Sequence, residues 1–76
     1  MTFDEAVRKW DRKHHAALND VHSYIQKGDS TIIYPRSLYR QAVTTQIFSD
    51  FGFSLRKVIR ENGKKAFYRY VKSKNT

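Results

Sequence analysis

Apolar residues in the first third of the chain recur at the spacing of an amphipathic helix. They fall at alternating intervals of four and three residues, at Phe3, Val7, Trp10, His14, Ala17, Val21 and Tyr24. Thr2 and Glu5 have the spacing of a capping box, which starts a helix. Gly28 stands where a left-handed residue ends one. The pattern predicts one long helix from residue 3 to about residue 27.

A short strand and further helical structure are expected next. Residues 31–34 are β-branched or aromatic and precede Pro35, which favours an extended backbone before it. Pro35 or Ser37 then suits the start of a helix, and Gly52 suits its end. Two interpretations are open: a single helix across residues 36–51, or two short helices separated near Thr44-Thr45. Adjacent β-branched residues lower helix propensity, so the second is favoured.

The C-terminal third has the pattern of a β-hairpin. Asn62-Gly63 favours a two-residue turn in which both residues have positive φ. Such a turn opposes Arg60 to Lys65 and Arg56 to Arg69. Alternation then predicts a core-facing surface of Phe53, Leu55, Ile59, Ala66, Tyr68 and Tyr70. The opposite face would carry Arg56, Arg60, Lys65 and Arg69 around Val58, Phe67 and Val71.

These elements predict an α+β fold in a single small domain, residues 1–76, with residues 73–76 as a flexible tail. Their order (helix, short strand, one or two helices, hairpin) resembles that of winged-helix domains. The resemblance implies that the helix before the hairpin enters the major groove of DNA and that the hairpin is a wing on the backbone. Carried over, the base-facing positions are Thr44, Thr45, Gln46 and Ser49, and phosphates meet Arg36, Arg40, Lys64 and Lys65. Asp50 departs from this scheme because it places an acid in the same helix.

Charge is concentrated in the hairpin region. Residues 51–76 contain eight Lys and Arg residues and one acid, whereas residues 1–50 contain seven and six. Apolar residues alternate through the basic segment, so it is expected to fold rather than remain a disordered tail. Opposed like charges destabilise a strand pair, and a phosphate backbone would relieve that repulsion. The competing interpretation is a solvated face that protects a sheet edge from aggregation.

The favoured function is therefore binding of nucleic acid, with double-stranded DNA preferred to RNA, in a regulatory, viral or plasmid-borne protein. The expected site residues are Arg36, Arg40, Thr45, Gln46, Ser49, Arg56, Arg60, Lys64, Lys65 and Arg69. The alternative is a small protein-binding module or inhibitor that docks its basic hairpin on an acidic partner. In that case the stripe of Phe3, Val7 and Trp10 is a second candidate contact surface. In the DNA-binding interpretation, the long first helix is instead a candidate interface for a homodimer.

Other function classes find little support in the sequence. The seven acids are scattered, and no nucleophile or phosphate-loop motif is present, so an enzyme with a catalytic site or bound cofactor is not expected. His15 and His22 are two helical turns apart, about 10 Å, which is too far for one metal ion. The absence of Cys, of a membrane-spanning run and of a signal peptide favours a cytoplasmic protein, or a nuclear one in a eukaryotic host.

Overall fold

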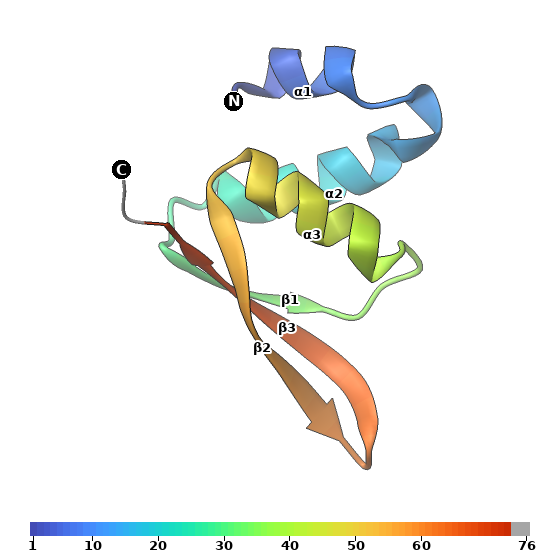
Figure 1. The fold of residues 1–76 in the computed structure, drawn as a ribbon, viewed down its shortest axis with the longest axis vertical. Helices are drawn as coiled ribbons and strands as arrows, with labels where there is room; N and C mark the ends of the chain where they lie inside the picture. The colour runs from blue at the N-terminus through green and yellow to red at the C-terminus, as the bar shows by residue number, and fades with distance from the viewer. Residues whose placement is uncertain (74–76) are drawn as a thin grey trace.

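Helices cover one face of a three-stranded antiparallel sheet (Figure 1). The computed structural model describes residues 1–73. In chain order its elements are α1 (Phe3–Lys9), a 3₁₀ helix (Arg12–His14), α2 (His15–Ile25), β1 (Thr31–Pro35), α3 (Gln41–Asp50), β2 (Phe53–Glu61) and β3 (Lys64–Lys72). The strand order is β1-β3-β2. The expected α+β class is confirmed.

The expected long first helix is wrong, because the chain turns between α1 and α2. The backbone of Trp10 and of Asp11 is extended, with ψ of 139° and 152°. The break leaves helix carbonyls without intrahelical partners. His15 satisfies two of them: its Nε2 donates to the carbonyl oxygens of Val7 and Trp10, at 3.0 and 2.8 Å.

Packing explains why the break is favoured. An unbroken helix of residues 3–27 would be about 37 Å long, close to the 38 Å longest dimension of the whole domain. Its first half would then extend past the other elements with its apolar stripe in water. In the folded chain α1 turns back instead, so that Ala6 is fully buried and Phe3, Val7 and Trp10 pack against the core.

The favoured break near Thr44-Thr45 is wrong, and the single helix of the other interpretation starts later than expected. Residues 36–40 form an irregular loop, and a single helix follows from Gln41 to Asp50. Thr44 and Thr45 lie in the middle of α3, where neither caps a helix. The Thr44 hydroxyl lies 3.2 Å from the carbonyl oxygen of Gln41, and Thr45 Oγ1 lies 2.7 Å from the Tyr70 hydroxyl. Because both hydroxyls have partners, the β-branched pair is accommodated within the helix.

Aromatic rings fill the space between α3 and the sheet. Phe48 stacks on Tyr70 with ring centroids 3.9 Å apart, and it meets Tyr34 edge-on at 5.4 Å. All three side chains are fully buried. Tyr34 donates its hydroxyl proton to the Asp20 carboxylate, and Tyr70 pairs with Thr45. Burial raises the pKa of both tyrosines above the usual value, so they remain neutral.

The hairpin forms at the expected turn but with a different register. Asn62 and Gly63 both have positive φ, 52° and 77°, and Arg60 pairs with Lys65 as expected. Two irregularities then interrupt the ladder, between Ile59 and Arg60 and between Leu55 and Lys57. They leave Ala66 on β3 and Arg56 on β2 without direct partners.

The first irregularity overturns the expected division of the hairpin faces. An unpaired residue in one strand shifts the register by one, so the residues beyond it point to the opposite face of the sheet from the one a regular hairpin would give them. Ile59 therefore pairs with Phe67, Val58 with Tyr68, and Lys57 with Arg69. The expected pair Arg56/Arg69 is wrong. Val58 packs against the core, whereas the sequence pattern had placed it on the cationic face.

The end of β3 is held against the start of β2. The Ser73 amide donates to the Gly52 carbonyl at 2.7 Å, and the Ser73 and Ser54 hydroxyls lie 3.2 Å apart. The rest of the expected tail, residues 74–76, lies outside the described residues. Within residues 1–73, no helix has both the length and the apolar character needed to span a bilayer.

Candidate nucleic-acid interface

Arg60 and Lys65 lie on the side of the hairpin that faces the helices. Val58 points into the core, so alternation along β2 turns Ile59 away from the helices and Arg60 toward them. Lys65, which lies opposite Arg60 on β3, also faces the helices. Its Nζ lies 3.4 Å from Oε1 of Gln41, the first residue of α3. The cationic side of the hairpin and the start of α3 are therefore adjacent.

Two further arginines lie beside this junction. The Arg36 amide donates to the Ala66 carbonyl at 2.8 Å, which holds the loop after β1 against the hairpin. Arg40 is the residue directly before α3, and the side chains of both arginines are exposed. The surface formed by Arg36, Arg40, Arg60 and Lys65 with the exposed side of α3 is called the α3–hairpin surface below.

Only part of the expected base-facing set is exposed. Gln46 and Ser49 are exposed on α3. Thr44 is 1% exposed, and Thr45 is half-buried with its hydroxyl paired to Tyr70. The expectation that the two threonines project into solvent is therefore wrong for Thr44 and holds only in part for Thr45.

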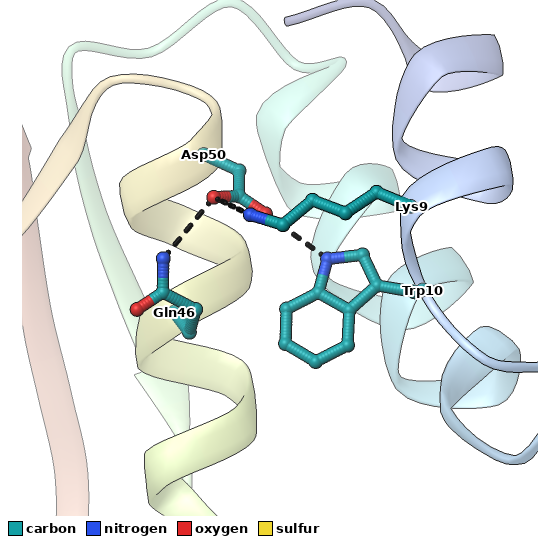
Figure 2. A network of polar contacts seen from close by, with 4 residues as sticks. All are labelled: Lys9, Trp10, Gln46 and Asp50. Carbon is teal, nitrogen blue, oxygen red and sulfur yellow. Dashed lines mark hydrogen bonds and ion pairs between the residues drawn. The ribbon is translucent and has the colours of Figure 1, made fainter.

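Asp50, the acid that departed from the winged-helix scheme, forms an ion pair with Lys9. Figure 2 shows its carboxylate between Lys9, Trp10 and Gln46. Lys9 Nζ lies 2.7 Å away, Trp10 Nε1 donates at 3.0 Å and the Gln46 amide donates at 3.1 Å. Burial by itself would raise the pKa of Asp50, but these hydrogen bonds and the Lys9 charge outweigh it and hold the pKa below its usual value. Asp50 thus stays ionised and fastens α1 to α3.

We expect Asp50→Asn to destabilise the domain by about 1–2 kcal/mol at neutral pH, because it removes the ion pair with Lys9 but keeps an acceptor for Trp10. The pKa of Asp50 is lower in the folded state, so its stabilisation is complete above the unfolded value and is lost as pH falls through the folded one. Urea unfolding of both proteins from about pH 7 to about pH 3 should show the difference shrinking. A difference that does not change with pH would contradict this account.

The remaining expected residues are distributed over the hairpin. Lys64 lies opposite Glu61 in the strand register next to the turn, and Arg56 is exposed at the irregularity of β2. Arg69 lies on the sheet face that points away from the helices, where its partner is Lys57. Lys57 was missed by the sequence analysis, because a regular hairpin would have turned it toward the core.

The basic character of this half of the molecule is nearly uncompensated. From Thr31 to Ser73 the chain has nine Lys and Arg residues and two acids, Asp50 and Glu61. Since Asp50 is paired with Lys9, Glu61 is the one remaining acid in this segment. The positive potential is therefore concentrated around α3 and the hairpin.

The histidines and the apolar stripe of the first helix are the remaining features singled out by the sequence. Among residues 1–73, no group of three or more His, Cys, Asp or Glu side chains is arranged to hold a metal ion. The stripe of Phe3, Val7 and Trp10 packs against the domain's own core. A homodimer through the first helix remains a prediction, but most of the apolar surface that suggested it is already used within the molecule.

No protein-family model, curated protein or solved structure is significantly similar to this chain. A function must therefore be inferred from the charges, hydrogen bonds and apolar faces of the chain itself.

Proposed function

We propose that the chain binds double-stranded DNA through the α3–hairpin surface. The observation that carries the proposal is the position of Arg60 and Lys65. They are directly opposed on the side of the hairpin next to α3, whereas the acid of the hairpin, Glu61, lies opposite Lys64 beside the turn. Two opposed cations repel each other, and a phosphate placed between them would replace that repulsion with two ion pairs.

The arrangement of elements supports a winged-helix-like mode of binding. A helix directly precedes a long hairpin, and Figure 1 shows the hairpin extending beyond β1 and α3. One helix, α3, lies between β1 and the hairpin, because residues 36–40 form a loop. In the proposed complex α3 lies along the DNA and the hairpin contacts the adjacent backbone.

Phosphate contacts supply most of the affinity in this proposal. Arg36 and Arg40 lie at the entry to α3, and Arg60 and Lys65 lie on the hairpin, so one duplex could meet all four. Contacts to bases are few, since Gln46 already donates to Asp50 and Ser49 is a short side chain. We therefore propose binding with weak sequence preference.

A titration with random duplex DNA at about 50 to 200 mM salt tests the proposal. Four phosphate contacts predict a slope of about −3 to −4 for log K against log[salt], because each contact releases condensed counterions. A slope near zero, or no binding at low salt, would overturn it. In that case an acidic protein becomes the better candidate partner for the basic hairpin.

A further inference from the structure

The sheet face turned away from the helices, called the outer face below, is composed of three cross-strand rows. In the order β1, β3, β2 the rows are Thr31–Val71–Ser54, Ile33–Arg69–Lys57 and Pro35–Phe67–Ile59. The inner face is closed, because its residues Ile32, Tyr34, Tyr68 and Tyr70 are buried under the helices. Within residues 1–73, no helix covers the outer face (Figure 1).

The outer face is more apolar than a solvated sheet face requires. Strands with one wet face normally alternate apolar and polar residues. Here Ile33 is 46% exposed, and Phe67, Ile59 and Val71 are half-buried without packing against the core. Packing of the core does not explain why these four positions are apolar, since the helices contact the other face of the sheet.

The same face carries a positive charge at its centre. Arg69 lies on the middle strand, with Lys57 opposite it on β2 and Ile33 opposite it on β1. None of the nine outer-face residues is acidic. A second copy of the chain is a poor occupant, because face-to-face packing would bring the two Arg69–Lys57 rows together. The occupant must therefore be anionic and also offer apolar surface.

We infer that the outer face binds single-stranded nucleic acid. Unpaired bases expose flat apolar faces that stack on aromatic side chains, and every nucleotide adds a negative charge. Phe67 and Arg69 are two residues apart on the same face of β3, about 7 Å. A base on Phe67 would thus place its phosphate near Arg69 and Lys57. A duplex cannot use Phe67 in this way, because its bases are stacked inside the helix.

The assignment is separate from the proposed duplex site. Arg60 and Lys65 lie on the opposite side of the hairpin, so the two ligands would not compete for the same side chains. An acidic peptide is the other class of partner with this chemistry. It is less favoured because a polynucleotide has a charge on every unit, matching a chain of net charge +8.

Fluorescence anisotropy with a labelled oligothymidine of about twelve nucleotides tests the inference. We expect binding at low salt and about tenfold weaker binding by Phe67→Ala, the usual effect of losing one stacked base. Phe67→Leu keeps the apolar contact without the aromatic ring and should also bind more weakly. Both variants should bind duplex DNA as the wild type does, and their unfolding curves control for stability.

Three results would overturn the inference. One is equal oligothymidine affinity for wild type and both Phe67 variants, whether or not duplex DNA is bound. Another is displacement of oligothymidine by oligoglutamate at equal charge, which would assign the face to an acidic protein. The third is sedimentation of the wild type as a dimer that Phe67→Ala converts to a monomer, which would make the occupant a second copy.

Discussion

Phe48→Ala should strongly destabilise the domain. Phe48 is fully buried, stacks on Tyr70 and also contacts the rings of Tyr34 and Phe53. Truncating a buried Phe to Ala costs about 3–5 kcal/mol, because transfer free energy is lost and a cavity remains. At about 0.05–0.15 kcal/mol per residue, a chain of 76 residues has only about 4–11 kcal/mol of stability. The change therefore removes a large share of the total.

Urea unfolding followed by circular dichroism measures this effect. Leu38→Ala is the matched control, since Leu38 is fully exposed in the loop before α3 and its truncation should change stability by less than about 0.5 kcal/mol. A midpoint for Phe48→Ala close to that of Leu38→Ala would contradict the packing described for the core.

Reversing Arg60 and Lys65 together should nearly abolish duplex binding. The double change Arg60→Glu and Lys65→Glu replaces two ion pairs with two repulsions at the α3–hairpin surface. We expect an affinity loss of about a hundredfold, or about 2.7 kcal/mol, near physiological salt. The salt slope should flatten by about two, because two phosphate contacts are lost.

The outer face provides a control of equal charge. Lys57→Glu with Arg69→Glu changes the net charge by the same amount and also reverses an opposed pair of the same hairpin. This second double variant should keep most of its duplex affinity and lose its affinity for oligothymidine. If both double variants weaken duplex binding equally, net charge alone controls binding and the α3–hairpin surface is not a site.

Local sequence signals were sufficient for several elements. The capping box of Thr2 and Glu5 forms as expected, since both hydrogen bonds depend on residues three apart. Asn62-Gly63 forms the hairpin turn because the two residues tolerate positive φ. Of the candidate site, the opposed pair Arg60/Lys65 was predictable, because it lies between the turn and the first irregularity in register.

The tertiary structure decided the features that depend on distant contacts. The helix breaks at Trp10, whose indole donates to Asp50, 40 residues further along the chain. α3 continues through Thr45 because the hydroxyl of Tyr70, 25 residues away, is its partner. Neither contact can be predicted from a local pattern of hydrophobic and polar residues, because the partners are far apart in the sequence.

The basic hairpin is the clearest case of this division. The sequence by itself determined that the segment is a cationic hairpin with a turn at Asn62-Gly63. Val58 and Tyr68 pair with each other and pack against the core, and the strand register shifts at Ala66 to allow this. The shift decides which cations share a face. Arg60 and Lys65 therefore lie beside α3, and Arg69 lies with Lys57 on the outer face. A strand's pairing register is set by the surface it must bury, and that surface exists only in the folded domain.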